Sequence, residues 1–302
     1  MRTLIITSSV DTTTDMLVND VGPDCFIRLN YDRPTDWAIE IFGGNLKISS
    51  EILRLNFTNF DISKCIWRKP FTIEPEVYPY TDAYFLAEWK YLIFEIFFLL
   101  DAEGKRYLNR PIPDNLFGKH TQIRSAEKYF NVEKISTSIN IPLGLQKNKI
   151  TKSLSSTPFS DGSVLYSVDV TNQILDGSLW TIQKKITRSH DLTVVFVHGS
   201  IFPFQLSRDE FKGLDWRKDP FNLFDKWQFI KLPDELEKNI RGFMEHVDLQ
   251  YGRLDFLSNH NGEDAVFLEV NRNGQWAWLD HKKKYGLFKK MREIYDPRIK
   301  KS

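Results

Sequence analysis

Three side chains with oxygen donors interrupt two apolar runs near the C-terminus of the chain. Asp255 lies in the run at residues 251–258, and Glu269 and Asn271 lie in the run at residues 265–278. Each run has the composition and bounded length of a strand. Carboxylate and amide oxygens suit Mg²⁺, which takes one or two carboxylates and completes its shell with water and substrate phosphates. The three residues therefore predict a magnesium site that holds a nucleotide.

The predicted site depends on how the two strands pair. Side chains alternate between the faces of a strand, so Glu269 and Phe267 are expected on one face and Leu268 on the core face. A two-residue turn at residues 261–262 would pair Asp255 with Leu268 and turn the carboxylate inward. A loop with an odd number of residues, which we predict, or a bulge would place Asp255 opposite Glu269. The alternative is an ordinary hairpin whose acids lie on the surface.

The composition is that of a globular chain without a strong overall charge. With 302 residues, of which 41% are hydrophobic, the chain can bury a large core in roughly two domains. Because the net charge is +1, the sequence predicts neither a nucleic-acid nor a membrane partner. Residues 83–100 carry charges that favour a buried amphipathic helix over a membrane span. Cys25 and Cys65 lack metal-ligand spacing, and the N-terminal apolar run is too short for a signal peptide, which together favour a cytoplasmic location.

Local patterns predict strands and helices in a βα order, with a boundary near the two prolines of residues 109–114. Helices are expected from the stretch at residues 11–15, where an Asp or a Thr caps the first turn, and at residues 83–100, 119–130 and 234–246. The expected strands are at residues 3–7, 26–30, 37–42, 64–68, 149–156, 179–186, 191–197, 201–206, 251–258 and 265–278.

The order of these motifs resembles the ATP-grasp ligases. The general part is Glu269-x-Asn271 after an upstream aspartate. The specific part is Leu-Glu-Val-Asn-Arg-Asn-Gly-Gln-Trp at residues 268–276, together with Asp-Trp-Arg at residues 215–217. With Ile-Trp-Arg-Lys-Pro at residues 66–70 and the opening Ile-Ile-Thr-Ser-x-x-Asp-x-Thr-Thr-Asp, the chain is similar to the microviridin-type ribosomal-peptide maturases, also called graspetide synthetases. The resemblance covers essentially the whole chain.

The resemblance implies a role for each residue of the site. The implied residues are Asp255, Glu269 and Asn271 for Mg²⁺, Lys119 and Lys152 for the α- and β-phosphates, Arg217 with Lys152 for catalysis at the γ-phosphate, Gln183 with the backbone of Lys185 and Ile186 for adenine, and Asp191 near the ribose.

Three positions depart from the pattern of this family, and the segment between Lys119 and Lys152 is short. Arg272 stands where a proline is usual. Leu192 follows Asp191 where an arginine is usual, so one phosphate contact is either missing or supplied by Arg208 or Arg253. Lys184 stands where a glutamate is common after the glutamine, which changes the polarity expected for the nucleotide pocket.

The resemblance also implies an architecture and an activity. The expected fold is an α/β (α+β) ATP-grasp fold with an N-terminal pre-ATP-grasp α/β domain at residues 1–110. A central subdomain at residues 111–180, with a serine-rich lid loop at residues 153–163, would bind the leader of a ribosomal precursor peptide. Residues 181–302 would hold Mg²⁺ and ATP.

The implied reaction is ADP-forming. Asp or Glu carboxylates of the peptide become acyl phosphates and then join Ser or Thr hydroxyls or Lys amines, which closes ester or amide rings. Two alternatives remain, namely a ligase of amino acids or dipeptides and an ATP-binding module without turnover. The family also makes a homodimer an expectation.

Overall fold

The computed structural model describes residues 1–68, 83–111, 117–139, 148–155, 166–170, 179–218 and 222–299. Contacts divide the chain into two compact units, which we call unit 1 (Met1–Pro111 with Gln275–Ser302) and unit 2 (Ile112–Gly274). The C-terminal segment groups with unit 1 and not with residues 181–274, with which the sequence-based division placed it.

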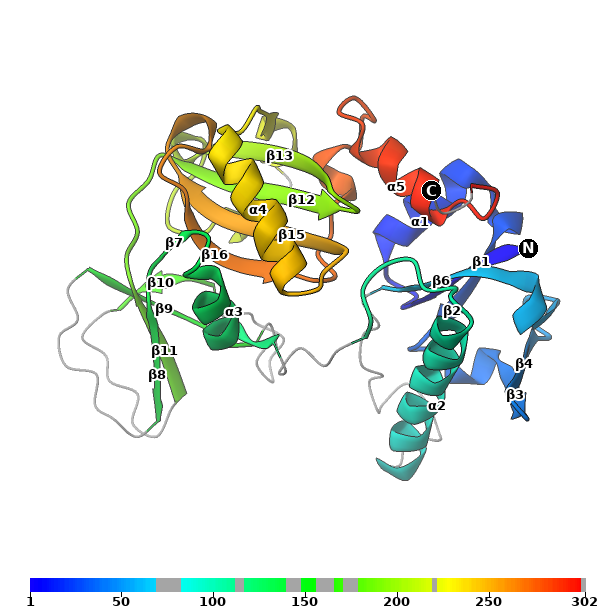
Figure 1. The fold of residues 1–302 in the computed structure, drawn as a ribbon. Helices are drawn as coiled ribbons and strands as arrows, with labels where there is room; N and C mark the ends of the chain where they lie inside the picture. Colours follow the sequence, from blue (N-terminus) through cyan, green and yellow to red (C-terminus); the bar gives the residue numbers. More distant parts are fainter. Residues whose placement is uncertain are drawn as a thin grey trace. The chain divides into compact units, whose positions relative to one another are not determined.

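The described part of unit 1 contains a parallel and an antiparallel sheet, each of three strands (Figure 1). In the first, β1 lies between β2 and β6 and runs parallel to both. In the second, β3, β4 and β5 follow one another as an antiparallel meander. The elements are β1 (Arg2–Thr7), α1 (Thr12–Val21), β2 (Phe26–Asn30), β3 (Ala38–Phe42), β4 (Asn45–Ser50), β5 (Leu55–Thr58), β6 (Ile62–Trp67), α2 (Ala83–Ala102) and α5 (Leu287–Tyr295).

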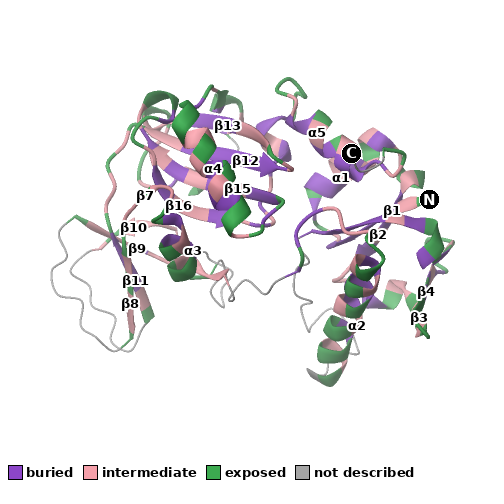
Figure 2. Cartoon of the chain, in the orientation of Figure 1, coloured by how far each residue is buried: buried purple, intermediate pink, exposed green. Residues whose placement is uncertain are grey.

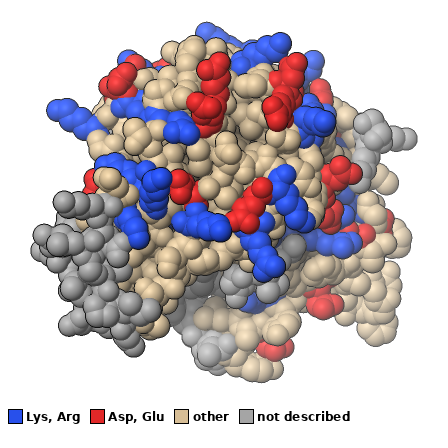
Figure 3. Space-filling model, turned by 60° about the vertical axis from the view of Figure 1, so that its left-hand side comes forward, with Lys and Arg blue, Asp and Glu red and all other residues tan. Residues whose placement is uncertain are grey.

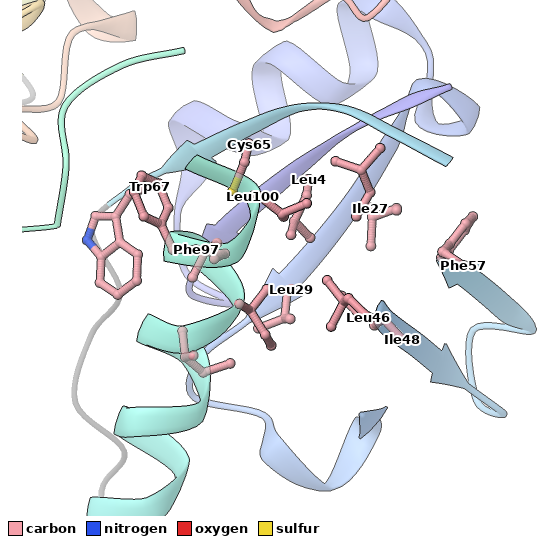
Figure 4. Packing of buried hydrophobic residues seen from close by; sticks show 14 of the residues in the cluster. Leu4, Ile27, Leu29, Leu46, Ile48, Phe57, Cys65, Trp67, Phe97 and Leu100 are labelled. Atoms are coloured by element: carbon pink, nitrogen blue, oxygen red, sulfur yellow. The ribbon is translucent and has the colours of Figure 1, made fainter. Parts of the chain in front are cut away.

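One face of α2 covers the core of unit 1. Phe97 and Leu100 are fully buried and point toward Leu4 and Ile27 of the parallel sheet (Figure 4). Leu46 of the antiparallel sheet belongs to the same cluster. Burial of a side chain of this size stabilises the fold by about 1.5–3 kcal/mol. The predicted buried amphipathic helix is thus confirmed, and among the described helices none has both the length and the apolar character needed to cross a bilayer.

The C-terminal part of the specific motif packs within unit 1. Gln275 Nε2 donates to Asp11 Oδ1 at 3.3 Å, and Arg68 Nη2 donates to Gln275 Oε1 at 2.6 Å. Asp11 also caps α1 through the backbone N–H of Thr14, as predicted from the sequence. Trp276 is fully buried. Gln275 therefore holds the C-terminal segment to the start of the first helix, and neither residue lines the pocket described below.

The described part of unit 2 contains a four-stranded antiparallel sheet in the order β10-β9-β11-β8 and a six-stranded sheet in the order β14-β13-β12-β15-β16-β7. Its elements are α3 (Lys119–Ala126), β7 (Asn131–Val132), β8 (Ile135–Ile139), β9 (Lys149–Lys152), β10 (Val168–Asp169), β11 (Leu179–Lys184), β12 (His190–Val197), β13 (Ser200–Ser207), β14 (Gln228–Phe229), α4 (Asp234–His246), β15 (Tyr251–Ser258) and β16 (Val266–Asn271).

Aromatic rings form the centre of the unit 2 core, where α4 packs on the six-stranded sheet. Phe243 of α4 meets Phe130 and Phe267 with ring centroids 5.4 Å apart in each case. Phe256 of β15 completes the cluster. The helix predicted at residues 119–130 ends at Ala126, because the chain after it turns to place β7 parallel to β16.

Charged side chains of both signs are mixed on the surface of the molecule. On the face drawn in Figure 3, lysines and arginines lie interspersed with aspartates and glutamates. This distribution agrees with the net charge of +1. The expectation that no nucleic acid is bound stays a prediction.

Candidate active site

The pairing of β15 with β16 brings the predicted carboxylates together. Asp255 lies opposite Glu269. One residue nearer the turn, Phe256 pairs with Phe267, so the register shifts between Asp255 and Phe256. The extra residue on β16 is Leu268, which makes a β-bulge. The predicted pairing of the two acids is confirmed.

The predicted odd loop is wrong, because the bulge sets this register instead. Between the turn and the bulge, Leu257 pairs with Val266, which is the register that a two-residue turn at residues 261–262 would give. The bulge then shifts the pairing by one residue and breaks the strict alternation of faces. Phe267 is fully buried in the core, whereas Leu268 lines the pocket. The faces predicted for these two side chains are therefore wrong.

Both oxygens of the Asp255 carboxylate have hydrogen-bond donors. Asn271 Nδ2 donates to Asp255 Oδ2 at 2.9 Å and lies 3.5 Å from Glu269 Oε1. Arg253 Nη2 donates to the same Asp255 oxygen at 3.1 Å. Thr193 Oγ1, on the neighbouring strand β12, donates to Asp255 Oδ1 at 2.6 Å. The three predicted metal ligands thus form one connected group.

The chemistry of this group fits Mg²⁺. Among the described residues, no group of three His, Cys, Asp or Glu side chains is placed to hold a metal ion. Asp255 and Glu269 supply two carboxylates, so a third protein oxygen would have to come from the amide of Asn271. A half-turn of the Asn271 amide would direct that oxygen toward the carboxylates. Burial acts to raise the pKa of Glu269, but the charges of Lys119, Lys152 and Arg217 outweigh it and hold that pKa at about 2. Glu269 is therefore ionised at neutral pH, as a metal ligand must be.

Two of the predicted cations are fixed by acidic partners. Lys119, the first residue of α3, places Nζ 3.3 Å from Glu269 Oε2 and donates to the carbonyl oxygen of Ser153 at 2.8 Å. Arg217 donates to both oxygens of Asp215, from Nε at 2.8 Å and from Nη2 at 2.6 Å. Such a two-point contact fixes the plane of a guanidinium group as well as its position. Asp215 is only 5% exposed, so it is a rigid base for Arg217.

Lys152 is held by Gln183 across the paired strands β9 and β11. Its Nζ donates to Gln183 Oε1 at 2.8 Å, and Gln183 Nε2 donates to the carbonyl oxygen of Glu133 at 2.8 Å. Burial, with the charge of Lys119, lowers the pKa of Lys152 to about 8. The resemblance placed Gln183 beside adenine, and its amide here positions the lysine.

Asp191 and Arg208 form an ion pair at another part of the pocket wall. Arg208 Nη1 lies 2.7 Å from Asp191 Oδ2, and its Nη2 donates to the carbonyl oxygen of Leu214 at 3.1 Å. Burial raises the pKa of Asp191 to about 7 in spite of the arginine. Both arginines that could supply the phosphate contact absent at Leu192 are thus paired with an acid, Arg208 with Asp191 and Arg253 with Asp255.

One pocket of unit 2, with a volume of about 320 Å³, collects these groups. This volume is typical of small-ligand sites. Asn271 does not line the pocket itself, but its amide is hydrogen-bonded to Asp255, which does. The predicted site residues that line it are Lys119, Lys152, Gln183, Lys185, Ile186, Asp191, Arg217, Asp255 and Glu269.

Two further residues of the site received no role from the sequence. Thr193 lies opposite Asp255 in the pairing of β12 with β15, so only the strand register could have revealed it. Asp215 was noticed as part of the Asp-x-Arg motif, and that spacing was the available signal for its contact with Arg217. Leu192, the departure from the family pattern, is 1% exposed and belongs to the apolar core.

Comparison with known proteins gives matches among solved structures. No protein-family model matches the chain, and no curated protein sequence does. A RiPP-associated ATP-grasp ligase of Chryseobacterium gregarium, in complex with ADP and a leader and core peptide, is 20% identical with a TM-score of 0.78, over 100% of this chain and 98% of that one. The macrocyclase MdnC of Microcystis aeruginosa, bound to the precursor peptide MdnA, is 20% identical with a TM-score of 0.74, over 98% and 99%.

A third structure matches at lower identity. The ATP-grasp ligase PsnB, complexed with a phosphomimetic variant of a minimal precursor, Mg and ADP, is 10% identical with a TM-score of 0.68, over 99% of each chain. At these identities the likeness concerns the course of the backbone, and it extends over nearly the full length of every pair. The chain therefore has the ATP-grasp fold, preceded by the α/β domain that the sequence predicted.

Proposed function

We propose that this protein is an ATP- and Mg²⁺-dependent ligase that activates carboxyl groups of a ribosomal precursor peptide. The observation that carries the proposal is the pocket in which the carboxylates of Asp255 and Glu269 lie among Lys119, Lys152 and Arg217. Paired carboxylates suit a divalent cation, and clustered cations suit a triphosphate. The fold, shared with structures that hold ADP and precursor peptides, supports a peptide as the substrate.

In the proposed complex, each group acts on one part of the nucleotide. Asp255, Glu269 and Asn271 would hold Mg²⁺, which supplies positive charge to the phosphate oxygens. Lys119 and Lys152 would bind the α- and β-phosphates. Phosphoryl transfer requires alignment and charge stabilisation more than a protein nucleophile, and this site offers both.

The proposed reaction has two displacements. In the first, a carboxylate oxygen of the peptide forms a bond to the γ-phosphorus of ATP while the bond to the β–γ bridging oxygen breaks, and ADP leaves. Arg217, fixed by Asp215, stabilises the charge on the transferred group. In the second, a hydroxyl or amine of the peptide attacks the acyl carbon, loses its proton and expels inorganic phosphate. The product is an ester or an amide.

An acyl phosphate must be kept from water until the second displacement. Aromatic side chains of the pocket wall serve this purpose. Trp216 and Trp227 both line the pocket, with ring centroids 5.2 Å apart in an edge-to-face arrangement. Tyr166 lines it as well. The predicted serine-rich lid at residues 153–163 lies mostly outside the described residues.

The test uses the purified protein with ATP, Mg²⁺ and the peptide encoded by a short reading frame beside its gene. We expect mass spectrometry to show the loss of one water per ring closed, together with release of ADP. The Glu269→Ala variant should lose both activities. Glu263→Ala, an exposed acid of the same hairpin, is the matched control and should retain them.

Other outcomes would point to the alternatives. ADP release with free amino acids and not with the peptide would indicate a small-molecule ligase. ATP binding without turnover on any substrate would indicate a binding module. Unchanged turnover in Glu269→Ala would contradict the proposed metal site itself. We place the reaction in the cytoplasm, where ATP, Mg²⁺ and a newly translated peptide are available together.

A further inference from the structure

The ammonium group of Lys119 contacts the carboxylate on which the proposed metal site depends. Its Nζ lies 3.3 Å from Glu269 Oε2 and donates to the carbonyl oxygen of Ser153 at 2.8 Å. Although burial acts to raise the pKa of Glu269, nearby charges lower it to about 2, and Lys119 has the largest effect among them. A cation of the chain itself therefore holds an oxygen that a divalent ion would use.

Helix α3 determines where Lys119 can reach. Lys119 is the first residue of this helix, and Gln122 lies one turn later. Gln122 Oε1 accepts from the backbone N–H of Val270 at 2.8 Å, and Gln122 Nε2 donates to the carbonyl oxygen of Phe117 at 2.9 Å. In Figure 2, α3 shows buried positions beside exposed ones, as expected of a helix with one side on a sheet. Because Val270 follows Glu269 on β16, the backbone of Lys119 stays near Glu269 while the end of its flexible side chain can turn.

The helix itself gains no stability from a lysine at this position. The N-terminus of a helix carries a partial positive charge, which disfavours a cation in the first turn. The first turn of α3 contains no acidic residue that would offset this effect. The charge of Lys119 is therefore stabilised by its contacts with Glu269 and Ser153 and not by the helix.

The other oxygens of the two carboxylates also have donors from the chain. Asp255 Oδ1 accepts a hydrogen bond from Thr193 Oγ1. Asp255 Oδ2 accepts hydrogen bonds from Asn271 Nδ2 and Arg253 Nη2. Asn271 Nδ2 also lies 3.5 Å from Glu269 Oε1. A divalent ion would therefore bind in competition with donors that already engage these oxygens.

These donors differ in how they can respond to a metal ion. A hydroxyl or an amide has an oxygen of its own, so Thr193 and Asn271 can turn in place and present it. An ammonium group has only hydrogens to donate, so Lys119 must either leave Glu269 or stay as a positive charge beside the ion. Leaving breaks an ion pair, and staying brings like charges together. Both responses weaken the binding of a metal ion on its own.

A phosphate group changes this balance. Lys119 lines the same pocket as Lys152 and Arg217, where the phosphates of the nucleotide are proposed to bind. A phosphate oxygen can accept from Nζ in place of Glu269 Oε2, so the lysine exchanges one anionic partner for another. Glu269 is then available to the metal ion without the loss of an ion pair.

We propose that Lys119 controls access to the metal site, because it withholds Glu269 from a divalent ion until the phosphates of a nucleotide accept the lysine in its place. The nucleotide and the metal ion then bind interdependently, and the coupling is the same in both directions. The inference rests on the proposed function for the identity of the two ligands. If Lys119 served the phosphates alone, the metal affinity of the protein without nucleotide would not depend on it.

The test measures the binding of Mn²⁺ to the full chain by electron paramagnetic resonance, which detects the unbound ion. Lys119→Met removes the ammonium group and keeps a side chain of similar length. Without nucleotide, this variant should bind Mn²⁺ about tenfold more tightly than the wild type. Lys128→Met removes the charge of an exposed lysine just beyond the end of α3, so it is the matched control and should bind Mn²⁺ as the wild type does.

The second measurement repeats these titrations with saturating ADP. Wild type and Lys119→Met should then bind Mn²⁺ with similar affinity, because the lysine of the wild type has left Glu269. The gain in Mn²⁺ affinity that ADP produces should therefore be about tenfold smaller for the variant. Association of Mn²⁺ with ADP in solution is the same for both proteins, so it cancels in this comparison.

The outcomes separate this inference from the proposed function. Equal or weaker binding of Mn²⁺ to Lys119→Met without nucleotide would overturn the control by Lys119 and leave the ligase proposal intact. Binding of Mn²⁺ that is unchanged in Glu269→Ala would instead contradict the metal site and the proposed function with it. Circular dichroism should show that Lys119→Met is folded, because α3 gains nothing from the lysine. Lys119→Gln, which replaces the lysine with a polar side chain, should give the same affinities and so exclude an effect of the methionine itself.

Discussion

Replacing Lys152 by methionine should stabilise the nucleotide-free protein at neutral pH while abolishing its turnover. Lys152 lies in the pocket wall, where burial and then the charge of Lys119 lower its pKa from the ordinary 10.5 to about 8. The folded protein therefore holds an ammonium group in a place that disfavours its charge. A methionine of similar length removes that charge without leaving a cavity.

The size of the effect follows from two opposing contributions. A pKa lowered from 10.5 to about 8 corresponds to about 3 kcal/mol, at 1.36 kcal/mol for each pH unit. Against this, the variant leaves Gln183 Oε1 without the donor that now lies at 2.8 Å, which costs about 1–2 kcal/mol. The variant should therefore be more stable than the wild type by about 1–2 kcal/mol at pH 7.

The sign of the difference should reverse with pH. Between pH 8 and 10.5 the unfolded chain binds a proton at Lys152 that the folded protein has released, so the stability of the wild type rises with pH over this window. The methionine variant lacks this rise. Above about pH 10.5 only the loss at Gln183 remains, and the variant becomes the less stable protein.

The assay is urea denaturation of both proteins without nucleotide, at pH 7 and again near pH 10.5, beside measurement of ADP release. Lys184→Met is the matched control, because that lysine side chain is 69% exposed and its removal should have a small effect at either pH. The reasoning is refuted if Lys152→Met destabilises the protein at pH 7, or if its effect does not depend on pH.

Three other substitutions test separate contacts of the pocket. Asp215→Asn should leave folding intact and lower kcat about ten- to a hundredfold, since Arg217 loses its two-point support; a fall in kcat with KM unchanged, measured by ADP release, separates this from a binding defect. Arg253→Met removes a cation beside Asp255 and should therefore weaken ATP binding, measured by calorimetry, about tenfold. Asp191→Asn should gain stability relative to the wild type as pH rises from about 4 to 7. Burial raises the pKa of Asp191 to about 7, so over this range the unfolded wild-type chain has released a proton that the folded protein still holds, and the wild type loses stability. Equal slopes in thermal melts across this range would contradict the raised pKa.

The type and bounds of some elements could be predicted from the sequence, because the local residue pattern and the packing of the folded chain favour the same structure there. The strand at residues 191–197 and the helix at residues 234–246 match β12 and α4 closely. Strands of two residues, such as β7 and β14, have no periodicity of their own and exist only through their pairing. The bulge on β16 was equally hidden, because Phe267 and Leu268 are both apolar and the pattern gives no sign of which one faces the core.

For the site, the sequence could predict which residue types take part, but not the contacts that hold them in place. The carboxylates and the lysines could be named from motifs, since ligand chemistry restricts which residue types serve. The contacts that position them come from neighbouring strands or loops, and they depend on register. Thr193 reaches Asp255 only because β12 pairs with β15 in one alignment. Gln183 reaches Lys152 for the corresponding reason on β11 and β9.

The distribution of charge in the pocket is consistent with the proposed triphosphate, although Leu192 belongs to the apolar core. Six basic and four acidic side chains line it, so the positive charges exceed the negative ones by two when all ten groups are ionised. The basic residues are Lys119, Lys152, Lys185, Arg208, Arg217 and Arg253, and the acidic residues are Asp191, Asp215, Asp255 and Glu269. A fully ionised ATP with one Mg²⁺ carries two negative charges in excess, which this surplus matches. Arg253 supplies one of the two positive charges from β15, next to the strand that carries Leu192. In the proposed complex, Arg253 would therefore compensate within the same sheet for the departure at residue 192.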